Sequence, residues 1–342
     1  MPTLLYVRQQ SASSINNPHF TIPEGRLLPV STLNANLEVA VRPVAAHGLE
    51  LTSARTASVG DMTVRRLLPL RQRRSVGAWC FIDHYGPMSV DGVAGMAVPP
   101  HPHIGLQTVT WLFAGNVLHR DSLGSEQMIR PGQLNLMTAG RGIAHSEESP
   151  AKREPQLHGV QLWVALPEQS RQAVPGFEHH AELPSGQVGD LAVTVLLGSL
   201  AGLRSQATTF TSIVGAELTA VRGTADRIPL EPTFEHAVLV TRGAARVDET
   251  DLAPGSLLYV PSGHDDVAVA APEGTVLMLL GGEPLGEPLL MWWNFVARAP
   301  QEIAAAVADW REGRFGEVNG YAGEPLEPPP LDLRLLIRRT QR

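Results

Sequence analysis

Short β-rich runs, split by turn residues, dominate the chain from Met62 onward. Several short strands at this spacing are typical of a sandwich or barrel and not of a parallel sheet with crossover helices. Helical periodicity is strong only near the end, where Ile303, Val307 and Trp310 share one face and Gly313 provides a stop. The pattern therefore predicts an all-β fold with one short C-terminal helix. The clearest runs are MTVRRLL, GAWCFIDHYG, LQTVTWLFAG, GQLNLMTAG and LHGVQLWVAL.

The second half of the chain carries a faint repeat of the first half. In each half a strand-like run ends in a glycine, Gly115 or Gly243, and precedes a Pro-Gly turn. Each turn leads to another run and then to a histidine, His145 or His264. This repeat indicates an internal duplication of a β-domain, with a boundary near residues 185–190, where loop formers gather. The expected domains are an N-terminal extension (1–55), a first barrel (56–187), a second barrel (188–300) and a C-terminal helix and tail (301–342).

Two histidine motifs have the spacing of metal ligands. His101 and His103 flank a proline, and His145 and Glu147 follow a glycine-containing turn. Residues i and i+2 of a strand share a face, so each pair aims in one direction, and two such pairs on facing strands would bring four ligands to one point. Three imidazoles and one carboxylate suit a borderline divalent metal: iron, nickel, copper, cobalt, manganese or zinc. A six-coordinate ion would keep two positions for water, dioxygen or substrate.

Composition and charge exclude several classes of function. The net charge of −7 argues against direct nucleic-acid binding, which depends on Lys and Arg at phosphates, and against an anionic membrane surface. The single cysteine, Cys80, permits no internal disulfide, and its apolar neighbours predict an inert buried thiol. No signal peptide or membrane-spanning run is evident, so we expect a soluble cytoplasmic protein. The basic stretch Arg65 to Arg74 is interpreted as a solvated rim, and His179 and His180 as exposed loop residues.

Six longer stretches carry a distinctive pattern: RQRRSVGAWCFIDHYGP, HPHIGLQTVTWLF, HRDSLG, PGQLNLMTAGRGIAHSE, LHGVQLWVALP and GEPLGEPLLMWWNFVA. Together they resemble the pirin family, a branch of the cupin superfamily, over roughly residues 62–314. The resemblance implies two jelly-roll-type cupin β-barrels packed face to face in one chain. It also implies one divalent transition metal per chain, usually taken to be Fe(II), in the N-terminal barrel only. The family's ligands fall on His101, His103, His145 and Glu147, the four residues that the spacing singles out.

Other residues near these motifs are weaker candidates. Gln107 stands where many cupins have a glutamate, and because a neutral amide is a poor ligand the carboxylate role falls on Glu147. Gln107 would then either hydrogen-bond a ligand or water, or be a plain strand residue. His119 and His158 are candidates for groups behind the ligands, since metal-bound imidazoles usually donate their other N–H group to a partner. The alternatives are a turn cap at His119 and Asp121 and a satisfied core histidine at 158.

The second barrel is expected to be free of metal. Counting back from the repeated glycine puts Pro229 and Glu231 where the first barrel has its histidine pair. His236 and His264 remain, and two histidines without a second pair of ligands do not form a metal site. We therefore expect a structural role for this barrel, covering the first one and burying its outer strands.

The resemblance implies two different functions. Some bacterial pirin-like proteins are quercetinases, so it suggests ring opening of a small flavonol-like phenolic substrate by O2, yielding a depside and carbon monoxide. The metal would act as a Lewis acid and Glu147 as general base. Eukaryotic pirin instead suggests a non-enzymatic, iron-dependent redox sensor that binds a protein partner. A barrel that holds a metal or a small ligand without turnover is the third interpretation. A monomer is favoured, because a duplicated cupin satisfies within one chain what single cupins satisfy by dimerising.

Overall fold

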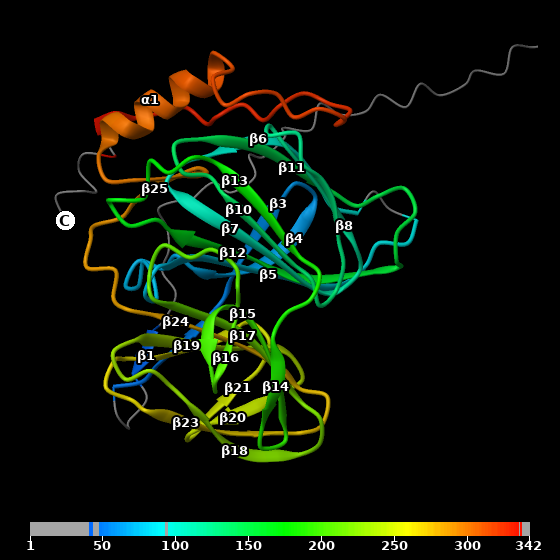
Figure 1. The fold of residues 1–342 in the computed structure, drawn as a ribbon, viewed down its shortest axis with the longest axis vertical. Coiled ribbons are helices and arrows are strands. Elements are labelled where there is room, and N and C mark those ends of the chain that lie inside the picture. Colours follow the sequence, from blue (N-terminus) through cyan, green and yellow to red (C-terminus); the bar gives the residue numbers. More distant parts are fainter. Residues whose placement is uncertain (1–40, 44–47, 93–94, 335, 337–342) are drawn as a thin grey trace, which may run out of the picture.

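The described residues form two β-sandwiches, one above the other in Figure 1, and the helix α1 (Pro300–Arg311). The computed structural model describes residues 41–43, 48–92, 95–334 and 336, so the expected extension up to residue 40 lies outside the described residues. An all-β fold with two jelly-roll domains and a short C-terminal helix is confirmed. In the described chain each domain is a pair of separate facing sheets, because no hydrogen-bonded ladder closes them into one barrel.

The first sandwich pairs a seven-stranded sheet with a four-stranded one. The larger sheet, in spatial order, is β13 (Gly176–His180), β10 (Leu134–Thr138), β7 (Leu106–Ala114), β12 (Gln156–Ala165), β5 (Trp79–Ser89), β4 (Met62–Leu68) and β3 (Arg55–Val59). The smaller sheet is β6 (Ala97–His103), β11 (Ile143–Glu148), β8 (Val117–Asp121) and β9 (Glu126–Ile129). All of these ladders are antiparallel, as short strands joined by tight turns require.

The second sandwich has the same two-layer plan. Its larger sheet is β1 (Val41–Pro43), β2 (Glu50–Ser53), β22 (Ser256–Val260), β19 (Glu235–Arg242), β24 (Val276–Gly282), β17 (Ile213–Ala220), β15 (Leu191–Leu200) and β14 (Ser185–Val188), with β16 (Leu203–Arg204) paired to β15. Its smaller sheet is β18 (Thr224–Pro229), β23 (Asp266–Ala271), β20 (Ala245–Val247) and β21 (Thr250–Leu252). A separate hairpin, β25 (Leu290–Trp292) and β26 (Phe295–Ala297), leads to the helix.

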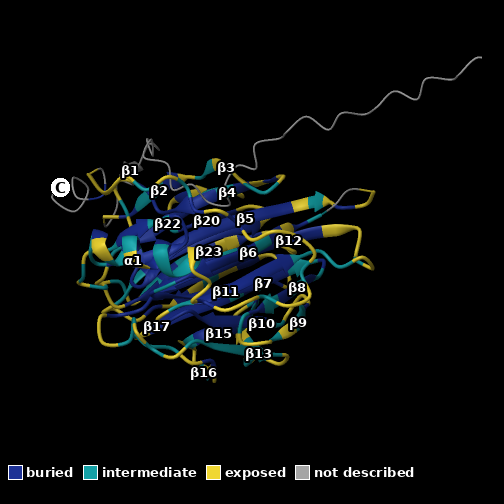
Figure 2. Ribbon diagram, turned by 90° about the horizontal axis from the view of Figure 1, so that it is seen from above, coloured by how far each residue is buried: buried dark blue, intermediate teal, exposed yellow. Residues whose placement is uncertain are grey.

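The outer faces of the two larger sheets pack against each other and form a core that spans both domains. It includes Trp79, Trp111 and Leu162 from the first domain with Leu239 and Met278 from the second. Figure 2 shows buried residues along the central strands of the stacked sheets and exposed residues mainly in the loops. Strands β5, β7 and β12 are therefore covered on both faces, on one side by the small sheet and on the other by the second domain.

Both described ends of the chain cross to the opposite domain, which corrects the expected domain limits. Strand β2 pairs with β22, so residues 50–53 complete the larger sheet of the second domain. Hairpin β25–β26 and helix α1 pack into the first domain, where Phe295 and Ile303 join its core and Ile104 forms a bridge to Phe295. Figure 1 shows α1 lying over β6, so the second domain ends before residue 290.

Two expectations about polar residues are wrong. The basic stretch is not all a solvated rim, because Arg66 is only 1% exposed and forms an ion pair with Asp83. His179 and His180 lie on strand β13 and are half-buried, because that strand extends the larger sheet of the first domain. Cys80 is confirmed as a buried free thiol, and burial raises its pKa to about 12. In the described chain, no helix has the length and apolar character needed to span a membrane.

Candidate metal centre

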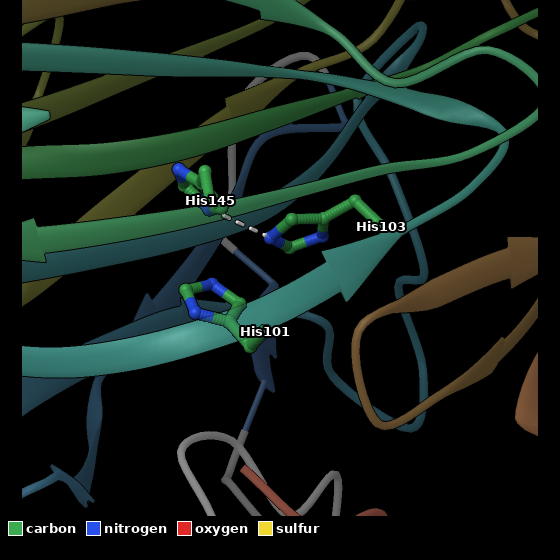
Figure 3. Close-up of side chains that lie close together, drawn as sticks. All are labelled: His101, His103 and His145. Atoms are coloured by element: carbon green, nitrogen blue, oxygen red, sulfur yellow. Dashed lines mark hydrogen bonds between the residues drawn. The ribbon is translucent and has the colours of Figure 1, made fainter. Parts of the chain in front are cut away.

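Neighbouring antiparallel strands of the small sheet bring the predicted ligands together. His145 on β11 is directly opposite His101 on β6, and Ile143 is opposite His103. Strand β6 has one extra residue between Val98 and His101, so its pairing with β11 shifts between His145 and Glu147. Figure 3 shows His101 and His103 on one strand, both turned towards His145. One ligand nitrogen from each of the three histidines lies within 4.8 Å of the others.

Hydrogen bonds to backbone carbonyl groups determine which ring nitrogen of His101 and of His103 faces the cluster. The Nδ1 atoms of His101 and His103 lie 2.8 Å from the Pro99 carbonyl oxygen and 3.0 Å from the Asn294 carbonyl oxygen. A carbonyl only accepts, so each Nδ1 carries the proton and each Nε2 keeps its lone pair. The Nε2 atom of His103 lies 3.1 Å from the Nε2 atom of His145. Two such lone pairs repel unless a cation lies with them, so this donor set fits a metal ion.

A chain of side chains supports His145 from behind. His119 Nδ1 lies 3.4 Å from His145 Nδ1, and His119 Nε2 lies 3.1 Å from Asp121 Oδ2. The Asp121 carboxylate therefore accepts from His119, whose other nitrogen accepts from His145. His119 also stacks on Phe177 with ring centroids 4.5 Å apart. His119 thus lies between His145 and Asp121, and Asp121 also caps the turn by accepting from the amides of residues 123 and 125.

Glu147 forms a second group of close ligand atoms with His119 and His145, again within 4.8 Å. His145 is common to both groups, so the Glu147 carboxylate lies next to the histidine cluster. Thr110 Oγ1 lies 2.8 Å from Glu147 Oε1 and 2.9 Å from Gln161 Oε1. A hydroxyl has one proton, so Thr110 donates to one of them at a time, and the charged carboxylate is the stronger acceptor.

Burial keeps the ligands in the forms that bind metals. Burial lowers the pKa of His101 to about 4 and that of His103 and His145 well below 6.5, so all three imidazoles are neutral at pH 7. Metal binding requires neutral imidazole, which here is present without a proton having to leave. Burial also raises the pKa of Glu147 above its ordinary value, because a carboxylate without a cation is costly in this interior.

Replacing Asp121 by asparagine should weaken metal binding by about 10- to 100-fold, the usual effect of losing a group behind a ligand. The asparagine side chain keeps an oxygen for the turn amides but presents an NH2 group where His119 needs an acceptor. Metal affinity is measured by competition with a chromophoric chelator. Asp91→Asn, on an exposed turn, serves as the control. Equal affinities for the two variants would show that the Asp121–His119 pair does not support the centre.

Gln107 and His158 lie on the other face of the larger sheet, which corrects the expectation that they stand behind the ligands. Gln107 donates to Thr138 Oγ1 (2.9 Å) and to the Thr208 carbonyl oxygen (3.1 Å) near the second domain. His158 Nε2 lies 2.8 Å from His84 Nε2, and burial lowers the pKa of His158 to about 4. Side chains of β7 and β12 alternate, so the inner face instead presents residues such as Thr110 and Gln161.

A row of polar side chains crosses the inner face of the larger sheet beneath the ligands. Strand registers place its members side by side from β4 to β13. At one end Arg66 pairs with both carboxylate oxygens of Asp83 at 2.6 Å. At the other end Asn135 Oδ1 lies 2.6 Å from His179 Nδ1. The members of this polar row are Arg66, Asp83, Gln161, Thr110, Asn135 and His179.

A cavity of about 50 Å³ lies between the polar row and the small sheet and reaches Glu147. One wall is the stacked pair Phe81 and Trp163, with ring centroids 4.0 Å apart, and Trp163 also meets the ring of His103 edge-on. The sequence could not single out this wall, because the cavity is assembled from strands distant in the chain. The lining residues are Val59, Met62, Val64, Phe81, Asp83, Tyr85, Met96, Val98, Glu147, Gln161, Trp163 and Asn294.

Fold and centre together define a two-domain cupin protein whose first domain holds a histidine–glutamate cluster that fits a metal ion. Family models described as Pirin and as Pirin C-terminal cupin domain match residues 61–164 and 215–316. The chain belongs to the pirin family.

Named relatives agree with this assignment. The chain is 44% identical over 292 residues to "Putative quercetin 2,3-dioxygenase PA1205" of Pseudomonas aeruginosa, covering 84% of this chain and 92% of that protein. It is 30% identical over 227 residues to human Pirin, covering 64% of this chain and 77% of that protein. The crystal structure of a quercetin 2,3-dioxygenase from Acinetobacter baumannii is similar with a TM-score of 0.80 and 41% identity, over 83% of this chain and 96% of that one.

Proposed function

We propose that the protein is a metal-dependent dioxygenase of the quercetin 2,3-dioxygenase type, acting on a flavonol-like phenolic substrate and O2. The observation that carries this proposal is the convergence of three neutral imidazoles, His101, His103 and His145, with Glu147 close to His145 and at the edge of a cavity that has an aromatic wall. The names of the relatives from Pseudomonas aeruginosa and Acinetobacter baumannii support the same reaction.

His101, His103, His145 and Glu147 would hold one divalent metal ion, which we propose to be Fe(II) in the cell. When bound, the ion supplies Lewis-acid and redox chemistry that lets an oxygen-bearing substrate react with dioxygen. Borderline nitrogen ligands with one carboxylate also suit nickel, copper, cobalt, manganese and zinc. Metal content of the purified protein therefore has to be measured beside activity.

The side chains around the centre bind and orient the substrate. Glu147 is the carboxylate that borders the cavity at the cluster, and it takes the proton of the substrate hydroxyl group as general base. Thr110 holds the carboxylate in place through its hydroxyl group. Phe81 and Trp163 form an aromatic wall against which the substrate packs. The overall reaction balances as quercetin (C15H10O7) plus O2 giving a depside acid (C14H10O8) plus CO.

Entry of a flavonol requires the cavity to widen. Ligand sites usually enclose about 300–1,000 Å³, whereas this cavity encloses about 50 Å³. Met62 and Met96 line it, and methionine is unbranched and changes rotamer easily. We therefore place the opening movement at these two side chains.

Oxygen uptake by the Fe(II)-reconstituted protein with quercetin tests the function. One O2 should be consumed and one CO released per quercetin, and Glu147→Gln should lower the rate at least about 100-fold by losing the general base. Glu148→Gln is the matched control, since Glu148 is the next residue on β11 and pairs with Arg120. Uptake that is independent of quercetin, or equal rates in the two variants, would refute the assignment.

A further inference from the structure

Tyr85 is a buried polar residue for which the protein itself provides no partner. It is 2% exposed and borders the cavity, and its hydroxyl group has no hydrogen-bond partner among the described residues. Buried polar groups are nearly always paired, and an unpaired one is costly, so such an exception calls for an explanation. A ligand that enters the cavity would supply the missing partner.

The strand register places this hydroxyl group over a glycine of the neighbouring strand. Tyr85 on β5 is directly opposite Gly159 on β12, in the row next to the pair of Asp83 and Gln161. A Cβ atom at position 159 would lie 2.6 Å from the Tyr85 hydroxyl oxygen, so only glycine leaves room for it there. The glycine thus positions the tyrosine beside the polar row on the inner face of the sheet.

The surroundings of the hydroxyl group are apolar on one side and acidic on the other. Val64 is the neighbour of Tyr85 on β4, and both border the cavity together with Val98 of the facing sheet. Burial raises the pKa of Tyr85 well above 10, and the charge of Glu147 raises it further. The hydroxyl group is therefore a donor at neutral pH, close enough to Glu147 to be affected by its charge.

We propose that the Tyr85 hydroxyl group donates a hydrogen bond to a second oxygen of the phenolic ligand, next to the oxygen whose proton Glu147 takes. This inference rests on the proposed function and narrows its substrate class to aromatic compounds with oxygens on adjacent carbons, such as flavonols and catechols. Tyr85 is then a positioning and specificity-determining residue. A simple phenol leaves the Tyr85 hydroxyl group unpaired and gains nothing from it.

Tyr85→Phe tests this inference because it removes only the hydroxyl oxygen and keeps the ring over Gly159. Affinities for quercetin, catechol and phenol are measured by calorimetry under anaerobic conditions with the Fe(II)-loaded protein, so that no turnover is needed. We expect Tyr85→Phe to weaken quercetin and catechol about tenfold, as the loss of one hydrogen bond implies, and to leave phenol unchanged. The Tm of the ligand-free variant should be equal or higher, since an unpaired buried group has been removed. If the hydroxyl group only stabilised the fold, Tyr85→Phe would lower the Tm.

Tyr259→Phe is the matched control, because the Tyr259 hydroxyl group donates to Glu235 in the second domain. It should lower the Tm and leave all three affinities unchanged. Wild-type affinity for quercetin and catechol in Tyr85→Phe would overturn the inference, whether or not the enzyme turns over. If the wild type binds both compounds through Tyr85 without consuming O2, the proposed dioxygenase function fails and the inference stands. If the wild type binds none of the three compounds, both fail.

Discussion

We expect His103→Ala to abolish quercetin-dependent oxygen uptake and to lower metal affinity at least about 100-fold, more than the loss of a supporting group would. His103 is the ligand whose Nε2 atom lies 3.1 Å from that of His145, and it is 1% exposed. The substitution removes one of the three inward-facing nitrogen ligands. No other side chain that lines the cavity carries an imidazole to replace it. Metal per chain is measured by mass spectrometry after gel filtration, and oxygen uptake with an electrode.

Stability measurements separate this effect from misfolding. A bound metal stabilises the native state in proportion to the logarithm of its concentration over Kd. The Tm of the wild type should therefore rise when metal is added, and that of His103→Ala should not. Without metal the variant should be nearly as stable as the wild type, because the repulsion between two facing lone pairs is gone. His264→Ala, a half-buried histidine of the second domain, should bind and respond as the wild type does. A full metal complement in His103→Ala would mean that the cluster is not the metal centre.

The histidine and glutamate pairs of the candidate site could be predicted from the sequence because their geometry is local. Residues two apart on a strand share a face, so the pairs His101 with His103 and His145 with Glu147 follow from spacing alone. The structure adds that their strands are neighbours in one sheet. Other parts of the site depend on contacts between distant segments. The carbonyl oxygen that orients His103 belongs to Asn294, 191 residues further along the chain.

The faces of the central strands could not be assigned for a physical reason. A strand with one face in water shows an alternation of apolar and polar residues, but β7 and β12 are covered by protein on both faces. Gln107 and Thr110 are both buried polar residues of β7, and only the register with β12 and β10 shows which of them faces the centre. The sequence also gives no sign that β2 joins the second domain or that β25–β26 packs into the first, since the sequence of a single strand does not indicate which sheet it will join.

We expect the stability of the fold to depend strongly on the interface between the domains. Trp79 lies in this interface. Its ring is fully buried, and its Nε1–H group lies 3.1 Å from the carbonyl oxygens of both Val214 and Gly281 in the second domain. A Cβ atom at Gly215 would lie 2.9 Å from the indole ring, so the ring packs directly on that backbone. Truncation leaves a large cavity between two sheets that are each held by their own ladders and cannot collapse to fill it.

Trp79→Ala should therefore lower the free energy of unfolding by about 3–5 kcal/mol, as truncations of large buried aromatic residues do. Trp79→Phe keeps most of the volume and loses the donor to two buried carbonyl groups, so we expect about 1–2 kcal/mol. Trp310 is the matched control, because it also donates through Nε1, to the Leu326 carbonyl oxygen at 2.9 Å, but is half-buried on α1. Denaturant unfolding of the metal-free protein measures all three variants. If Trp79→Ala is no less stable than Trp310→Ala, the two sheets do not depend on this ring, and the domains are joined mainly by the crossing segments β2 and β25–β26.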